Sequence, residues 1–324
     1  MPAHCQSSGH RPALTTSPAN SAPSRSNFEL LLLAILACLW GSSYLFTKIA
    51  VATIPPLTLV AGRVSLATIF LLLILAFQSA RLPRDWRTWR MLLVQSFCNS
   101  IASWTLLAWA QQHVASSLAG VLNSTSPLFV FFLTLLVDRT AKADGWKLFG
   151  TLLGLVGVAL VVGADSMQND GKPVIGPLAV LGSAFLYACA ALYGRRFASL
   201  SPTVTASGTM LWASAFLLPA SLVIDRPWTL DPSPAALLAV LALGFLCTGV
   251  ALLIYFRLVR TLGALGVASQ SYLRAGVSVL LGVGLLGEQL TAGIGVGLVA
   301  VVAGVVIINT QAPAVLLRVL RGKR

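Results

Sequence analysis

Charged side chains are rare in this chain, and acidic ones are the rarest. Of its 324 residues only 10% are charged and 57% are hydrophobic, which leaves too little polar surface to cover a soluble fold. Several stretches without any charged side chain, among them residues 30–47, 173–194 and 232–256, reach the ~20 residues that a helix needs to cross a ~30 Å hydrocarbon core. The composition therefore excludes a soluble globular protein and predicts an integral membrane protein.

Carboxylates are missing from the middle of every apolar stretch. All nine Asp and Glu residues lie in loops or at the ends of predicted spans, and Glu29, Asp138 and Glu288 are the three at span ends. A proton-driven exporter of cationic drugs would ordinarily need a carboxylate near the membrane midplane, so this class is disfavoured. A lipid-modifying enzyme would need a nucleophile with a base, a carboxylate pair or a metal cluster. The sequence offers none of these, and we do not expect an enzyme.

Cysteine and nucleotide-binding signatures are also scarce. The five cysteines are odd in number and scattered, and no pair has the spacing of metal ligands, so neither a disulfide framework nor a zinc site is indicated. No cofactor is expected. The phosphate-binding loop of ATP-driven pumps, G-x-x-x-x-G-K-[ST], is absent, so any pumping must draw on a gradient or on downhill flow.

The 22 basic residues are distributed unevenly among the connections between spans. If both ends are cytoplasmic, 17 of them fall on the cytoplasmic side, and only Lys172 and Arg226 lie in loops on the other side. Short loops orient a polytopic protein by keeping positive charge in the cytoplasm. The pattern predicts an inner-membrane protein with cytoplasmic termini. Its net charge of +13 then meets anionic lipid and does not indicate a nucleic-acid partner.

Turn signals divide the chain into ten hydrophobic spans. The first 27 residues, rich in Ser, Pro and Ala, cannot bury enough surface to fold and predict a disordered cytoplasmic tail, and residues 311–324 predict a basic one. The fold class is all-α, a polytopic membrane protein of ten transmembrane helices. The predicted spans are 28–50, 55–77, 90–112, 115–137, 146–164, 175–195, 203–224, 234–256, 264–287 and 290–310.

The second half of the chain is similar to the first at a displacement of about 148 residues. Lys48-Ile49-Ala50 matches Arg196-Phe197-Ala198, and Pro55 matches Pro202. Each unit, 28–164 and 175–310, holds five spans, an odd number, so the two units must face opposite ways. Inverted repeats of this kind are typical of alternating-access carriers, which hold the substrate near the midplane between the halves.

Four motifs stand out along the predicted spans. They are Leu39-Trp40-Gly41-Ser42-Ser43-Tyr44 with Lys48, Gly62-Arg63, Ser126-Pro127, and Tyr272-Leu273-Arg274 leading to Leu286-Gly287-Glu288. These motifs resemble those of the EamA-type transporters of the drug/metabolite transporter superfamily. The resemblance covers residues 30–310 and implies a ten-helix fold of two EamA repeats that exports small metabolites or amino acids. It also implies that helices 1 to 4 and 6 to 9 line the cavity, with helices 5 and 10 outside.

Two arginines lie deep within predicted spans. At 1.5 Å per residue, Arg63 is about 12 Å below the outer end of span 2, and Arg274 is about 15 Å from the cytoplasmic end of span 9. Both therefore start near the centre of a ~30 Å core, where a charged side chain is costly. Either they cap carbonyls freed by a kink or steady a helix pair, or they attract an anionic or zwitterionic substrate into a wet cavity.

Uncharged polar and aromatic side chains recur along single faces of several spans. Trp40, Ser43 and Tyr44, for example, share one helical face of span 1. Such side chains also hold helices together in membranes, but matched clusters in both halves favour a shared polar cavity. The predicted substrate-binding residues are Trp40, Ser43, Tyr44, Arg63, Asn99, Ser103, Trp104, Asn123, Tyr187, Gln270, Tyr272 and Arg274.

Two further residues are predicted to gate the cavity. Lys48, near the outer end of span 1, either reaches the headgroups or takes part in gating, and Pro127 should bend span 4 because it removes a backbone hydrogen bond. Glycines in spans 5 and 10 predict close helix packing, within the chain or between protomers, so a monomer and a homodimer both stay open. These glycines are Gly150, Gly154, Gly157, Gly293, Gly297 and Gly304.

The leading functional hypothesis is a secondary carrier that exports a small polar metabolite, an amino acid or a related carboxylate, by alternating access. Arg63 and Arg274 would hold the negative charge of this substrate. Import, or exchange resembling that of nucleotide-sugar carriers, is the alternative within transport. A non-transporting membrane scaffold is the alternative of a different class. The expected partners are a small-molecule substrate and membrane lipid.

Overall fold

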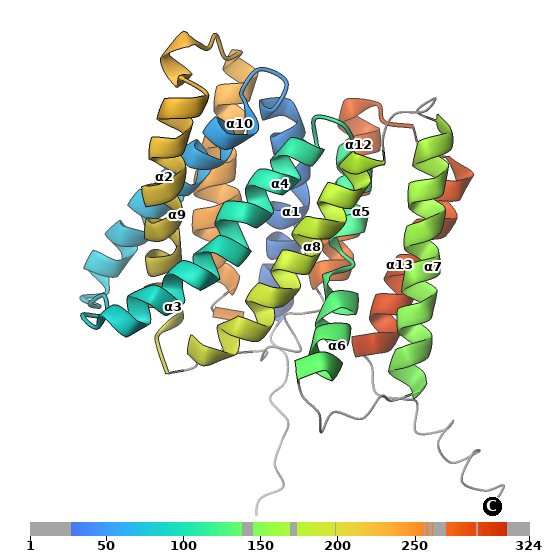
Figure 1. Cartoon of the computed structure of the whole chain (residues 1–324), viewed down its shortest axis with the longest axis horizontal. Coiled ribbons are helices and arrows are strands. Elements are labelled where there is room, and N and C mark those ends of the chain that lie inside the picture. The colour runs from blue at the N-terminus through green and yellow to red at the C-terminus, as the bar shows by residue number, and fades with distance from the viewer. Residues whose placement is uncertain are drawn as a thin grey trace, which may run out of the picture.

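The computed structural model of the chain is a bundle of long helices packed side by side (Figure 1). It describes residues 27–137, 145–168, 174–197, 199–255, 257–258, 261, 270–289 and 291–309, without the side chains of residues 164–168, 271, 272, 308 and 309. Within these ranges every regular element is helical, and eight helices are long and apolar enough to cross a membrane, beside two shorter apolar ones.

The first half of the chain forms five crossings. Helices α1 (Asn27–Ala50) and α2 (Pro56–Phe77) are each continuous. The third crossing is built from α3 (Trp86–Ser96), a π-helical turn η1 (Phe97–Ile101) and α4 (Ala102–Ala110). The fourth is broken into α5 (Ser116–Asn123) and α6 (Ser126–Val137), and α7 (Gly145–Gln168) is the fifth.

The second half repeats this order. Helix α8 (Ile175–Gly194) ends in a 3₁₀ turn η2 (Arg195–Phe197), and α9 (Pro202–Ile224) follows. After a short 3₁₀ turn η3 (Pro227–Thr229), the eighth crossing consists of α10 (Pro234–Gly244) and a π-helical turn η4 (Phe245–Val250), and it continues to Tyr255. Helices α12 (Gln270–Leu286) and α13 (Ala292–Asn309) are the last two crossings.

The all-α fold with ten crossings predicted from the sequence is confirmed, and most of the predicted spans agree with the helices to within a few residues. The ninth span was predicted to begin at residue 264, but residues 262–269 lie outside the described part of the chain. Within the described part, α12 begins at Gln270. Both predicted tails, 1–27 and 311–324, also lie outside it except for Asn27.

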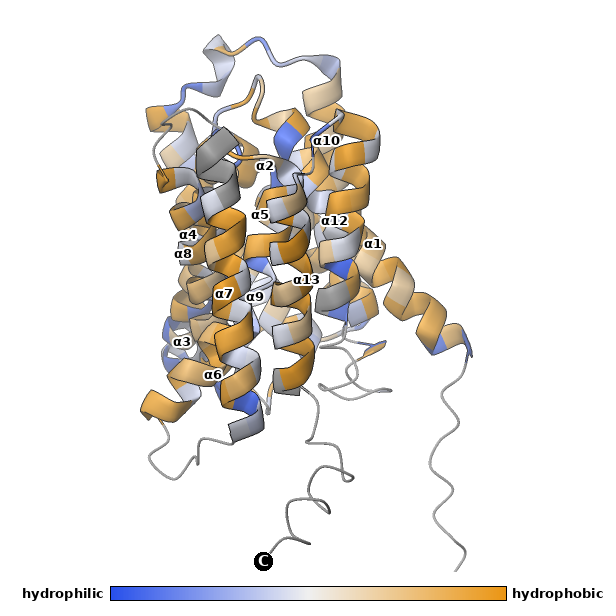
Figure 2. Cartoon of the chain, turned by 90° about the vertical axis from the view of Figure 1, so that its right-hand side faces the viewer, coloured by the Kyte–Doolittle hydropathy of each residue, from blue (hydrophilic) through white to orange (hydrophobic). Residues whose placement is uncertain are grey.

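Successive crossings alternate in direction, so their connections gather on two opposite faces of the bundle (Figure 1). One face, here named the basic face, carries the α2–α3 and α8–α9 connections, the start of α7 and the end of the eighth crossing. The other is named the opposite face and carries Arg226 in the α9–α10 connection. Between the faces, the outward sides of α7 and α13 are largely apolar (Figure 2), as a lipid-facing surface requires. The described basic residues of the basic face are Arg81, Arg84, Arg87, Arg90, Lys147, Arg195, Arg196 and Arg257.

The two halves pack against each other in a reciprocal pattern. Helix α2 packs on α9, and α7 packs on α13; α1 packs on α12 and α10, just as α8 packs on α6 and α4. The π-helical turns of the third and eighth crossings begin at Phe97 and Phe245, and 245 − 97 gives the 148-residue displacement of the sequence repeat. Exchanging the halves therefore leaves the arrangement of helices unchanged, as a pseudo-twofold axis requires.

Glycines allow α7 and α13 to approach closely. A Cβ atom at Gly150 would lie 2.8 Å from the carbonyl oxygen of Gly304, and one at Gly157 would lie 2.8 Å from that of Gly297. The low-numbered glycine of one helix faces the high-numbered glycine of the other, so the two helices are antiparallel and related by the same pseudo-symmetry. The predicted close packing is confirmed, and these glycines provide it within one chain instead of between protomers.

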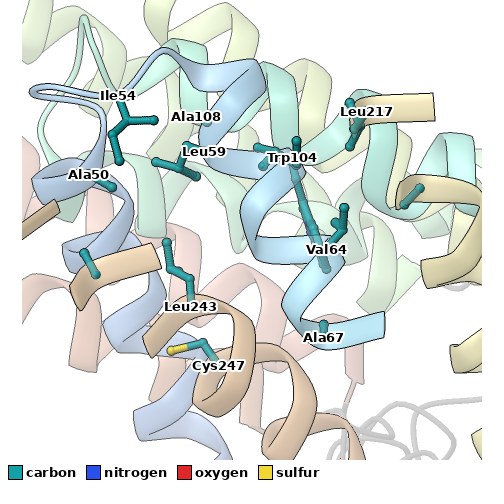
Figure 3. Packing of buried hydrophobic residues seen from close by; sticks show 14 of the residues in the cluster. Ala50, Ile54, Leu59, Val64, Ala67, Trp104, Ala108, Leu217, Leu243 and Cys247 are labelled. Atoms are coloured by element: carbon teal, nitrogen blue, oxygen red, sulfur yellow. The ribbon is translucent and has the colours of Figure 1, made fainter. Parts of the chain in front are cut away.

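A hydrophobic core beside the cavity joins the two halves (Figure 3). Leu59 and Val64 of α2 and Leu243 of α10 are at most 1% exposed, and they pack in one cluster with Trp104 of α4 and Leu217 of α9. Because this cluster draws on both repeats, it fixes α2 against α9 and α10. The ring of Trp104 is thereby held at the edge of the cavity described below.

Candidate functional site

A cavity of about 840 Å³ lies inside the bundle. Its lining comes from crossings one to four and six to nine, joined by Lys147 at the start of α7. The lining reaches the basic face at Lys147 and Arg195, and it includes no described residue of the connections 51–55 and 111–115 on the opposite face. The cavity therefore opens towards the basic face.

Arg63 lies deep in the cavity among neutral groups. Its guanidinium carbon is 4.0 Å from the centroid of the Trp104 ring, and its Nε donates a 2.9 Å hydrogen bond to the hydroxyl of Thr248. The indole N–H of Trp104 donates to the hydroxyl of Tyr187, which fixes the ring. Arg63 is only 8% exposed. A cation–π contact and one neutral hydrogen bond offset only part of the cost of burying a guanidinium, so the site favours a negatively charged guest.

The two π-helical turns place side chains on facing walls of the cavity. Asn99 in η1 and Cys247 in η4 are 148 residues apart and both line it, as does Thr248. A π-helical turn inserts one extra residue and rotates the face that follows, and such turns are frequent at functional sites. The hydroxyl of Thr248 also donates to the backbone carbonyl oxygen of Leu243, five residues earlier, over 2.8 Å. The turn therefore holds the Thr248 hydroxyl where it accepts the hydrogen bond from Arg63.

A chain of hydrogen bonds connects the cavity to the opposite face. The buried amide of Asn123 donates to the hydroxyl of Tyr44 over 2.7 Å, and Tyr44 lines the cavity. The fully buried side chain of Gln111 donates to the carbonyl oxygen of Tyr44 over 2.9 Å. The carbonyl oxygen of Gln111 accepts from the ammonium of Lys48 over 2.7 Å. Displacement of Tyr44 would thus be transmitted to the end of α4.

Helix α12 contributes the second cavity arginine. Arg274 and Gln270, one helical turn apart, both line the cavity. The buried Nε of Arg274 and the buried Oε1 of Gln270 find no hydrogen-bond partner within the described residues. Buried polar atoms are nearly always satisfied in native structures, so these two groups point to a missing partner such as water or a bound solute.

The fourth crossing is interrupted at the cavity, and Pro127 explains the break. Proline lacks the N–H that would bond the carbonyl of Asn123, and the hydroxyl of Ser126 donates to that carbonyl over 3.0 Å. Ser124 and Thr125 likewise donate to the carbonyls of Gly120 and Leu122 over 2.8 and 2.6 Å. These hydroxyls therefore serve the break in the helix, as irregular backbone beside a membrane cavity requires.

A clamp closes the opposite face at the turn between α4 and α5. Lys48 donates to the carbonyls of Gln111 and Val114 over 2.7 and 2.8 Å, at the end of α4. The Glu288 carboxylate accepts from the backbone N–H groups of Ser116 and Ser117 over 2.6 and 2.9 Å, at the start of α5. A cation at a helix C-terminus and an anion at a helix N-terminus are both favoured by the helix dipole. We name these contacts the outer clamp.

Other contacts reinforce this closure. Asp225 at the end of α9 accepts from the backbone N–H and the hydroxyl of Thr58 over 2.9 and 2.7 Å, at the start of α2.

The charge state of Glu288 follows from its surroundings. Burial raises the pKa of the Glu288 carboxyl, but the hydrogen bonds from Ser117 and Ser116 outweigh this effect of burial, so the pKa lies below the ordinary value. Glu288 is therefore charged at neutral pH, which the outer clamp needs.

The structure brings most of the predicted binding residues together around the cavity, with exceptions. Ser103 is fully buried outside the lining, and its hydroxyl meets that of Ser183 at 3.0 Å between α4 and α8. Asn123 is 1% exposed and stands behind Tyr44 instead of in the lining. The side chain of Tyr272 lies outside the described residues. The predicted residues that line the cavity are Trp40, Ser43, Tyr44, Arg63, Asn99, Trp104, Pro127, Tyr187, Gln270 and Arg274.

The lining also contains residues that were not predicted as binding residues. Thr248 and Tyr255 are the only hydroxyl-bearing residues between 234 and 256, and their isolation within an apolar run was a usable signal. Gln95 was noticeable as a polar residue four positions before Asn99. The mouth residues Lys147 and Arg195 carry no such signal, because basic residues at span ends are expected on orientation grounds alone.

Comparisons with known proteins agree with this arrangement. The sequence profile described as the EamA-like transporter family matches the chain twice, over residues 27–163 and 174–310. The chain is 28% identical over 256 residues to the "uncharacterized inner membrane transporter YedA" of Escherichia coli strain K12, which covers 79% of this chain and 82% of that protein. It is 27% identical over 286 residues to the "uncharacterized transporter YvbV" of Bacillus subtilis strain 168, covering 88% and 92%.

A solved crystal structure shares the fold. It superposes with a TM-score of 0.61 at 20% sequence identity and covers 88% of this chain and 98% of its own.

Two repeated units and ten crossings around a cavity that opens at one face are typical of a membrane transporter. The chain belongs to the EamA-like transporter family, and it is a multi-pass membrane protein.

Proposed function

We propose that the protein is a secondary transporter that exports a small polar metabolite, an amino acid or a related carboxylate, across the inner membrane by alternating access. The observation that carries this proposal is the cavity, which opens to the basic face, is closed by the outer clamp, and holds Arg63 and Arg274 in its lining. A carrier caught with its site open to one side has this geometry.

The direction in which the cavity faces follows from charge. Eight described basic residues lie on the basic face and Arg226 on the opposite one, and short positively charged connections stay in the cytoplasm. The basic face, where α1 begins and α13 ends, is therefore proposed as cytoplasmic, together with both termini. The printed name of the Escherichia coli relative places that protein in the inner membrane, which supports the same location here.

The transport step is proposed as rocking of the two inverted repeats around the cavity. Opening to the outside requires that Lys48 and Glu288 release the α4–α5 turn, while the mouth between Lys147 and Arg195 narrows. The broken fourth crossing supports this, because the helix is already interrupted at Ser124 and Thr125 and lacks the N–H of Pro127. Bending there costs less than bending an unbroken helix.

Import or exchange uses the same cavity, and a non-transporting scaffold would have no use for two arginines in its interior. Purified protein in liposomes, loaded with a labelled metabolite mixture, separates a carrier from a scaffold. We expect wild-type vesicles to release particular solutes, and Arg63→Ala and Arg274→Ala to slow the release at least about tenfold, with Arg226→Ala on the opposite face as the matched control. Release by both cavity variants at the wild-type rate would refute the site, and no release by the wild type would refute transport.

A further inference from the structure

Among the described residues, the charged side chains that line the cavity are all basic. They are Arg63 and Arg274 in its depth and Lys147 and Arg195 at its mouth. The described charges along the path from the basic face inwards thus have one sign. Low-dielectric walls focus such a potential into the cavity and concentrate solutes of the opposite sign there.

The two deep arginines are not neutralised by the described part of the protein. Arg63 contacts the Thr248 hydroxyl and the Trp104 ring, both uncharged. The ion pair found among the described residues joins Arg257 to Glu29 at the basic face, away from the cavity. Two guanidinium groups in a membrane interior are costly without counter-charge. A guest that brings negative charge removes this cost, whereas a zwitterion leaves the net charge of the site unchanged.

From this we infer that the cargo crosses as a net anion, a small organic carboxylate without a compensating ammonium group, and that the membrane potential itself drives its export. The inference rests on the proposed function and decides between the two cargo classes left open there. After a complete cycle every charge of the protein has returned to its starting position. The net charge moved across the membrane is therefore the charge of the cargo alone.

This charge accounting supplies an energy source. A cell keeps its interior negative, so an anion that leaves the cytoplasm moves down the electrical gradient. At 100 mV the potential sustains a concentration ratio of ~50-fold per elementary charge. Export then needs neither ATP nor a coupling ion.

Matched solute pairs test the inference, because a 2-oxo acid and its amino acid differ only at the second carbon, which carries a neutral oxo group in the first and an ammonium group in the second. Proteoliposomes with wild-type protein are loaded with a deproteinised cell extract supplemented with pyruvate and alanine, 2-oxoglutarate and glutamate, and phenylpyruvate and phenylalanine. Valinomycin and a potassium gradient set the interior at −100 mV, 0 mV or +100 mV, and mass spectrometry identifies the released solutes.

We expect every solute that the protein releases to be a net anion, with its final inside-to-outside ratio changing ~50-fold per charge for each 100 mV. Within a transported pair the 2-oxo acid should leave faster than its amino acid, whose net charge is less negative by one. Arg63→Gln combined with Arg274→Gln should slow this release about tenfold, while Arg226→Gln should not. Release of zwitterions, or release of anions that does not depend on the membrane potential, would overturn the inference but would still agree with the proposed transport function. No release of any solute would contradict the proposed function as well.

Discussion

Neutralising Glu288 should loosen the closed opposite face. In Glu288→Gln one oxygen can still accept, but the negative charge that faces the start of α5 is lost. Hydrogen bonds to a charged group contribute about 1.5–3 kcal/mol and neutral ones about 1 kcal/mol, and the helix N-terminus adds about 0.3–1 kcal/mol. Two bonds to the charged carboxylate are then reduced to one neutral bond, so we expect the closed form to lose at least about 2 kcal/mol. This corresponds to a shift of about 30-fold or more towards the outward-open form.

Cysteine accessibility from outside the cell measures this shift. Ser43 lines the cavity, so Ser43→Cys, in a chain whose native cysteines are replaced, reacts with a membrane-impermeant thiol reagent only when the opposite face opens. The added Glu288→Gln should raise the reaction rate about 30-fold or more. Asp85→Asn is the matched control, because Asp85 caps the start of α3 through Thr88 at the basic face. Equal rates in the Glu288 variant and this control would refute the clamp.

The remaining predictions concern other parts of the same structure. Acid should release the outer clamp. Because the pKa of Glu288 is lowered, its contribution to closure is complete from neutral pH down to the ordinary pKa of 4.5 and fades as the pH falls through the lowered pKa. Outside labelling of Ser43→Cys in proteoliposomes that stayed constant throughout that acid range would contradict this. Lys48→Met removes two hydrogen bonds to carbonyls and should raise the same labelling rate several-fold at neutral pH, with Lys48→Arg close to wild type. Gly157→Leu would bring a Cβ atom to 2.6 Å from the Val301 nitrogen and should destabilise the protein by about 1–3 kcal/mol, measured as a lower melting temperature in detergent. Gly163→Leu, where a Cβ meets open space, should melt like the wild type. Equal melting temperatures of the two variants would refute the packing of α7 on α13. Thr248→Val removes the acceptor for Arg63 and should weaken cargo binding about tenfold, as titration of the purified protein would measure; unchanged affinity would separate Arg63 from binding.

The fold was largely readable from the sequence because one property dominates it. The length of uncharged runs fixes the number of crossings, and the displacement of 148 residues between the halves reappears in the pairing of α7 with α13 and in the two π-helical turns. Arg63 and Arg274 were also predictable, since a charge within an apolar run has few places to go other than a cavity.

The details of the site were less readable, for geometric reasons. Each residue turns a helix by about 100°, so Ser103 and Trp104 point in different directions, and only packing decides which of them meets the cavity. The extra residue in η1 shifts that direction again, and no sequence pattern announces it. Of the outer clamp, Lys48 was predicted as a gating residue, but its partner Glu288 was not. Glu288 bonds Ser116, which is 172 residues away in the chain, and no local pattern links the two.

Two-sided labelling of Ser43→Cys tests the central claim most directly, namely that one cavity between inverted halves faces the cytoplasm and is shut on the other side. Inside-out and right-side-out membrane vesicles expose the basic and the opposite face in turn. The account predicts rapid labelling in inside-out vesicles and slow labelling in right-side-out vesicles, with the slow rate raised by Glu288→Gln. Rapid labelling of Ser43→Cys from the outside while Glu288 is unchanged, with no labelling from the cytoplasmic side, would contradict it.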